Sequence, residues 1–193
     1  MKKPLALSLL CLAMSAQAHV TIFTGTFAPE ATGATGTGTL QLDYDADGHT
    51  LLINATWSGL SGTTTNAHIH CCTTPLPRAG TAGVALGQQP ENRLPGFPLG
   101  VTGTTYLRVI DLTQTNQYSA TFLAGSGGTP LLAEQRLIAN LTSGNAYFNI
   151  HSSTFGTGEI RAFVTAVPEP ETYAMMFGGL ALMGAMLRRR RQS

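Results

Sequence analysis

Hydrophobic positions between residues 20 and 166 occur in short runs that are typical of β-strands. Each run is rich in Val, Ile, Thr, Tyr and Phe and is bounded by Gly, Asn, Asp or Pro, the residues that favour turns. The alternation is clearest at Leu51, Ile53, Ala55 and Trp57, where every second side chain is apolar and would face the same side of a sheet. We therefore expect an all-β, antiparallel fold with Trp57 in its core.

Eight such runs predict a fold of seven or eight strands. They cover residues 20–27, 37–44, 50–57, 66–70, 104–110, 118–122, 146–151 and 158–164. The stretch 32–39 is rich in Thr and Gly, and the stretch 90–98 is rich in Pro, so both are expected to be loops. This number of short strands, separated by turns, favours an antiparallel sandwich or barrel.

One segment follows helical rather than strand spacing. Thr129 can cap the helix, Pro130 suits its first position, and apolar residues recur at helical intervals until Ser143-Gly144. The sequence therefore predicts one short helix beside the strands.

The two ends of the chain differ from the middle. Two lysines, an apolar run over 5–14 and Ala16-Gln17-Ala18 are typical of a secretory signal peptide over residues 1–18. Near the other end, an apolar stretch over 173–187 precedes the four arginines Arg188, Arg189, Arg190 and Arg191. We expect a single transmembrane helix there, although its ~22 Å length is short of the ~30 Å hydrocarbon core.

This pattern divides the chain into a signal peptide (1–18), one domain (19–166) and a tail (167–193). Positive charge stays on the cytoplasmic side of a membrane, so the domain is expected to lie outside it. The whole chain has a net charge of +1, but the domain alone has five arginines, no lysine and eight acidic residues, a net charge of about −3. Without a basic cluster, no nucleic-acid partner is expected.

The domain contains two adjacent cysteines, Cys71 and Cys72. Thiols of exported proteins are usually oxidised or bound to metal, yet adjacent cysteines are an unusual geometry for a disulfide. A disulfide between them, an intermolecular pair and thiolate ligands all remain open.

Histidines are placed with strand spacing. His68 and His70 lie two residues apart in an expected strand and therefore share one face, while Ile69 faces the core. In 146–151 the apolar residues again take the core side, which leaves His151 on the other face.

Glu159 follows the same logic in the next expected strand. If these strands are neighbours, Glu159 gathers with His68, His70 and His151 on one surface. Imidazoles and a carboxylate bind copper or zinc, so these four residues are a candidate metal site. The alternative is that the histidines only form hydrogen bonds to outward neighbours such as Glu159 and Arg161.

Three ordered motifs carry a resemblance to a known family. Gly59-Leu60-Ser61 precedes Ala67-His68-Ile69-His70, and Asn149-Ile150-His151-Ser152 and Gly158-Glu159-Ile160-Arg161 follow. Together they resemble a CHRD domain over most of residues 20–165, which implies an immunoglobulin-like sandwich and, from the family's eukaryotic setting, extracellular protein binding.

The tail resembles a PEP-CTERM sorting signal, through Pro168, Glu169, Pro170, the apolar stretch and the arginines. This resemblance implies an exported protein that an exosortase-type enzyme cuts near Pro168, after transient anchoring in the inner membrane. The protein would then reach the cell surface or extracellular matrix. We expect a non-enzymatic module that binds a matrix protein or polysaccharide. The alternative is a copper- or zinc-binding or metal-redox protein of the envelope.

Four weaker functional interpretations are set aside. Asp43 to Gly48 matches the start of a calcium-binding EF-hand loop, but Asn54 stands where a bidentate glutamate is needed, so a hairpin turn is the better interpretation. His19, first after signal cleavage, could chelate copper only with another histidine close by. The chain also faintly resembles Cu/Zn superoxide dismutase but lacks an evident bridging histidine, and no serine or cysteine has an obvious catalytic base.

Overall fold

The computed structural model describes residues 20–73, 80–168, 178–180, 183 and 188. The signal peptide expected over 1–18 and most of the helix expected over 173–187 lie outside this range. In the described part of the chain, no helix is both long and apolar enough to span a membrane.

Eight antiparallel strands form one continuous sheet in the order β5-β4-β7-β8-β1-β2-β3-β6. The strands are β1 (Val20–Pro29), β2 (Thr37–Asp45), β3 (Thr50–Ser58), β4 (Thr64–Cys71), β5 (Val84–Leu86), β6 (Thr104–Asp111), β7 (Ala146–Ser152) and β8 (Ile160–Ala166). The expected antiparallel all-β class is confirmed.

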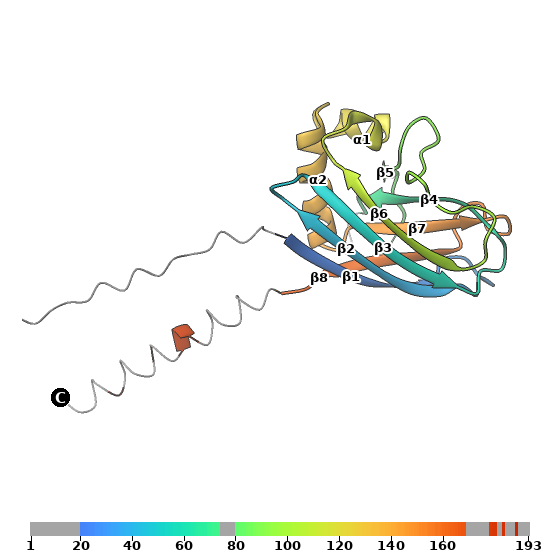
Figure 1. Cartoon of the computed structure of the whole chain (residues 1–193), viewed down its shortest axis with the longest axis horizontal. Coiled ribbons are helices and arrows are strands. Elements are labelled where there is room, and N and C mark those ends of the chain that lie inside the picture. Colours follow the sequence, from blue (N-terminus) through green and yellow to red (C-terminus); the bar gives the residue numbers. More distant parts are fainter. Residues whose placement is uncertain (1–19, 74–79, 169–177, 181–182, 184–187, 189–193) are drawn as a thin grey trace, which may run out of the picture.

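The sheet is curled around its core, as Figure 1 shows. An immunoglobulin-like sandwich, which was expected, has two separate sheets. Here β1 pairs along one edge with β2 and along the other with β8, so that Phe23 lies opposite both Leu42 and Ala166. Because this long central strand bonds on both sides, the two halves of the fold are parts of a single sheet.

Two elements differ from the sequence expectation. Residues 118–122, expected as a strand, instead follow a short 3₁₀ turn (Thr115–Gln117) and begin helix α1 (Ala120–Gly125). Ser119 caps α1, because its Oγ accepts a hydrogen bond from the backbone N–H of Phe122 (3.2 Å). Strand β5 was not expected, since three residues are too few to show alternation.

Helix α2 (Pro130–Thr142) matches the predicted helix. Thr129 is its N-cap and accepts a hydrogen bond from the N–H of Leu132 (3.4 Å). The two helices lie together at one end of the curled sheet (Figure 1).

The core lies inside the curl and joins both halves of the sheet. Phe27 of β1 packs edge-on against Phe148 of β7, with ring centroids 5.5 Å apart. Trp57 is 2% exposed, as expected of a core residue, and stacks on Phe97 at 5.2 Å. Aromatic pairs of this kind add stability beyond the burial of their area.

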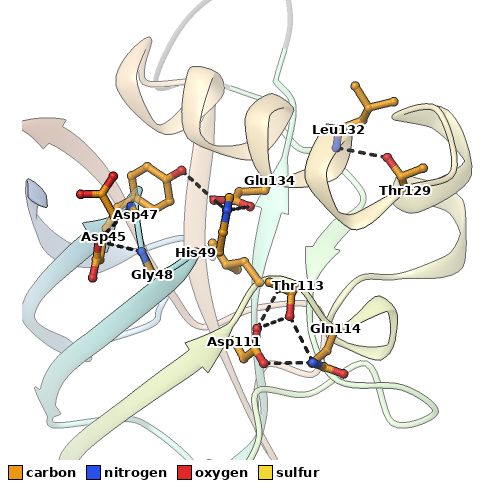
Figure 2. Close-up of polar contacts among 12 residues, drawn as sticks. Asp45, Asp47, Gly48, His49, Asp111, Thr113, Gln114, Thr129, Leu132 and Glu134 are labelled. Carbon is orange, nitrogen blue, oxygen red and sulfur yellow. Dashed lines mark hydrogen bonds and ion pairs between the residues drawn. The ribbon is translucent and has the colours of Figure 1, made fainter. Parts of the chain in front are cut away.

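The turn between β2 and β3 is tied to α2 by a buried carboxylate. Glu134 is 1% exposed. It accepts hydrogen bonds from the hydroxyl of Tyr44 (2.6 Å) and from Nδ1 of His49 (2.9 Å). Figure 2 shows His49 directed at Glu134 from the turn. Asp45 Oδ1 closes the same turn by accepting from the N–H of Asp47 and Gly48 (both 3.0 Å), which agrees with the hairpin interpretation of this segment.

We expect Tyr44→Phe to lower the free energy of unfolding by about 1–3 kcal/mol, because the buried Glu134 carboxylate loses one of its two donors. Urea unfolding followed by circular dichroism measures this change. Thr39→Val is the control, because Thr39 lies in the same strand, β2, but is exposed on its outer face. It should change the free energy of unfolding by less than about 0.5 kcal/mol. Equal stability of Tyr44→Phe and the wild type would show that the hydroxyl does not support Glu134.

Candidate metal centre

His68 and His70 project from the same side of β4. Ile69 between them is fully buried in the core, whereas His68 and His70 lie on the outer face of the sheet. His68 is nevertheless only 6% exposed, and His70 is half-buried. The alternation expected from the sequence is therefore present.

The pairing of β4 with β7 brings His151 to the same place. His68 lies opposite Asn149 and Asn66 lies opposite His151, so His68 and His151 are diagonal neighbours on one face. Phe148 and Ile150 of β7 face the core. One potential ligand nitrogen from each of His68, His70 and His151 lies within 4.8 Å of the other two. We call these residues the three-histidine group.

Each ring of the three-histidine group is held by a backbone carbonyl at Nδ1. The acceptors are Asn92 O for His68 (2.8 Å), Ala82 O for His70 (2.7 Å) and Gly156 O for His151 (2.9 Å). A carbonyl oxygen can only accept, so each Nδ1 carries the proton and donates. In the neutral ring, the lone pair is then on Nε2.

Two of these Nε2 atoms face one another. His68 Nε2 and His151 Nε2 are 2.8 Å apart. Burial lowers the pKa of His68 from 6.5 to about 4, and burial also lowers the pKa of His70. His68 is therefore neutral at pH 7. Because both rings donate at Nδ1, a proton or a metal cation must lie between the two Nε2 atoms at this distance.

Polar and aromatic side chains surround the group on the same face. The ring of Tyr147 stacks on His70, with centroids 4.8 Å apart, and the Arg161 guanidinium lies over Tyr147. Arg161 donates to Gly80 O (2.7 Å) and lies 3.4 Å from Glu30 Oε1. Asn149 donates a short hydrogen bond to Glu30 Oε2. Within the described part of the chain, these side chains contact one another and form no hydrogen bond to a histidine Nε2 atom.

Glu159 does not join the histidines, contrary to the expectation that it faces outward with Arg161. It precedes β8, follows Gly158 at a φ of +129°, and is fully buried. Its Oε1 accepts from the N–H of Ser61 (2.5 Å). Burial raises the pKa of Glu159, but hydrogen bonds from Ser152 and Ser61 outweigh burial and lower it overall. Glu159 therefore anchors the chain after β3 to the start of β8.

Other predicted site residues lie elsewhere. In the structure a disulfide joins Cys71 to Cys72, and neither sulfur belongs to the three-histidine group. Pro168 and Arg188 of the expected sorting signal are described, whereas Glu169, Pro170 and residues 189–191 lie outside the described part of the chain. Val20, the residue after His19, lies at one end of β1. The other end is Pro29, which precedes Glu30, the residue that accepts a hydrogen bond from Asn149 beside the three-histidine group.

Sequence reasoning missed the carbonyls of Ala82, Asn92 and Gly156, which orient the three rings. A main-chain carbonyl leaves no signature in residue identity, because every residue has one. Asn92 offers a partial signal: its φ is +49°, a left-handed conformation that asparagine adopts more readily than most residues.

Two family models match the chain. The CHRD domain matches residues 17–164, and the PEP-CTERM protein-sorting motif matches residues 166–191. The sorting motif implies export, membrane-associated sorting and recognition by exosortase-type processing. No curated protein and no solved structure was found to match. Because the CHRD match covers most of the chain, this protein belongs to the CHRD domain family and carries a PEP-CTERM sorting motif at its C-terminal end.

Proposed function

We propose that this exported CHRD domain binds one copper or zinc ion through the Nε2 atoms of His68, His70 and His151. The observation that supports it best is the set of three backbone carbonyls that hold each Nδ1 proton. Metal-binding histidines typically donate their second ring nitrogen in this way, which fixes the ring and directs the lone pair at the ion.

The spacing of the nitrogens suits such an ion. With metal–nitrogen bonds of ~2.0–2.1 Å, tetrahedral coordination needs nitrogens ~3.3 Å apart. His68 Nε2 and His151 Nε2, at 2.8 Å, must move apart by only about 0.5 Å. A bound cation would replace this contact by two metal–nitrogen bonds. Imidazole nitrogen suits both copper and zinc, and the ligand set alone does not choose between them.

The sorting motif supports a route to the cell exterior. We propose that the tail holds the protein transiently in the inner membrane, that an exosortase-type enzyme cuts it near Pro168, and that the domain then resides at the cell surface or in the extracellular matrix. The domain in this proposal is a binding module rather than an enzyme.

A second candidate function is attachment to a matrix polysaccharide. On the outer sheet face, cross-strand pairing aligns Thr26, Thr39, Thr56 and Thr105 in one row. A groove of about 300 Å³ crosses this face. Its polar lining consists of Thr24, Thr39, Gln41, Asn54 and Thr56. These groups are uncharged hydroxyls and amides, which favours a neutral, hydroxyl-rich ligand over a charged one.

The metal proposal predicts about one copper or zinc ion per chain. The full chain is purified in mild detergent without chelator or affinity metal, supplemented with each metal, dialysed and measured by inductively coupled plasma mass spectrometry. Loss of a residue that only hydrogen-bonds to a metal-binding side chain typically weakens metal affinity 10- to 100-fold. His151→Gln removes a metal-binding side chain itself and should weaken binding by more than this. The triple variant His68→Ala, His70→Ala and His151→Ala should bind none.

His49→Gln is the matched control, because His49 lies at the far turn with its Nδ1 bound to Glu134. It should keep wild-type metal content. Circular dichroism confirms that each variant is folded. Wild-type metal content in the folded triple variant, or absence of metal from the supplemented wild type, would refute the proposal.

The lowered pKa of His68 predicts how the stability of the metal-free protein depends on pH. Below the ordinary histidine pKa of 6.5, the unfolded chain binds a proton that folded His68 takes up only near pH 4. The free energy of unfolding is therefore not reduced by His68 above pH 6.5. It falls by on the order of 2–3 kcal/mol as the pH is lowered toward 4. Urea unfolding with chelator measures it. His68→Asn should lose less stability over the same interval, and an unchanged loss would count against a buried neutral His68.

The polysaccharide candidate predicts binding to neutral but not acidic polymers. In affinity electrophoresis of the full chain, gels with dextran should retard it more than gels with alginate. Removing two groove amides, in Gln41→Ala with Asn54→Ala, should weaken the dextran effect about tenfold, the equivalent of ~1.4 kcal/mol. Asn140→Ala on α2 is the control and should migrate like the wild type. Equal retardation by both polymers would argue against the groove.

A further inference from the structure

The three-histidine group supplies three ligands to one ion, and structural zinc sites almost always use four from the protein. Among the residues that the structure describes, the group contains no fourth His, Cys, Asp or Glu. The coordination offered by these residues is therefore incomplete.

The nearest charged side chains on this face already have partners. Glu30 accepts a hydrogen bond from Asn149 and forms an ion pair with Arg161. Arg161 also donates to Gly80 O. Farther along the chain, Glu159 accepts from Ser61, and Cys71 and Cys72 are joined to each other. Recruiting Glu30, Cys71 or Cys72 as a fourth ligand would break a contact that is present in the fold.

The three ligand atoms also carry no negative charge to compensate that of a metal ion. Three neutral imidazoles leave a divalent ion with its full charge, because no carboxylate or thiolate of the described residues lies among the ligand atoms. Two of the rings, His70 and His151, are partly exposed, so the site opens toward solvent on the outer face of the sheet. His68, in contrast, is buried and lies on the side of the site away from solvent.

We infer that this centre is an open one: a metal ion held by His68, His70 and His151 keeps an exchangeable position that a small anion from solution can occupy. This inference rests on the proposed metal-binding function. It places the site with ligand-binding metal centres, which keep a position for water or substrate, rather than with closed structural ones. The class of ligand is a small monodentate anion, since such an anion both completes the coordination and offsets the charge.

Azide titration of the copper(II)-loaded full chain tests the inference. Metal content is measured first, and a chain that binds no copper refutes the proposed function before azide is added. With copper bound, azide should produce a saturable change in the visible absorption and electron paramagnetic resonance spectra, with one azide per copper and the metal retained after dialysis.

Two outcomes would overturn the open centre while leaving metal binding intact. Spectra that stay unchanged at high azide, with copper retained, would show a closed coordination sphere. Release of copper by azide would show that the anion displaces the histidines instead of joining them. Perchlorate at the same concentration controls for ionic strength, because it coordinates weakly. His49→Gln should titrate like the wild type, since His49 lies at the remote β2–β3 turn.

Discussion

The register between β4 and β7 is the constraint on which the candidate site depends. Because His68 lies opposite Asn149, and Asn66 opposite His151, the two histidines become diagonal neighbours on the outer face. A slip of one residue would turn His151 toward the core and expose Ile150. The apolar residues that alternate with the histidines prevent this slip, since Ile69, Phe148 and Ile150 are all buried in the core. The hydrophobic core thus positions a polar site on the opposite face of the sheet.

Backbone carbonyls of three loops orient the histidine rings that the strands place together. The strands place three rings together, but the carbonyls of Ala82, Asn92 and Gly156 decide which nitrogen of each ring carries the proton. Ala82 precedes β5, Asn92 lies between β5 and β6, and Gly156 lies between β7 and β8, so the three carbonyls come from three loops next to the strands that pair with β4 or β7. The resulting preorganisation is the main difference between this group and three histidines that merely share a surface.

The secondary structure was largely predictable because the domain alternates apolar and polar residues so regularly. β3 shows this well: Leu51, Ile53, Ala55 and Trp57 are all buried, as their spacing predicts. The capping residue and proline likewise predicted α2. The misplaced segment, 118–122, has strand-like composition, but Ser119 caps a helix there through a contact whose geometry the sequence pattern does not show. Local propensity also could not distinguish one curled sheet from two, since that depends on β1 bonding along both edges.

The sequence by itself determined the antiparallel all-β class, the shared face of His68 and His70, and the sorting motif, because each depends on residue type and spacing along a short segment. Only the tertiary structure decided which residues complete the site. It brought His151 to the pair, and it buried Glu159 against Ser61, although both had been expected on the same surface. The physical reason is that strand parity fixes the face of a side chain only inside a strand, and Glu159 lies just before β8, where the chain turns at Gly158.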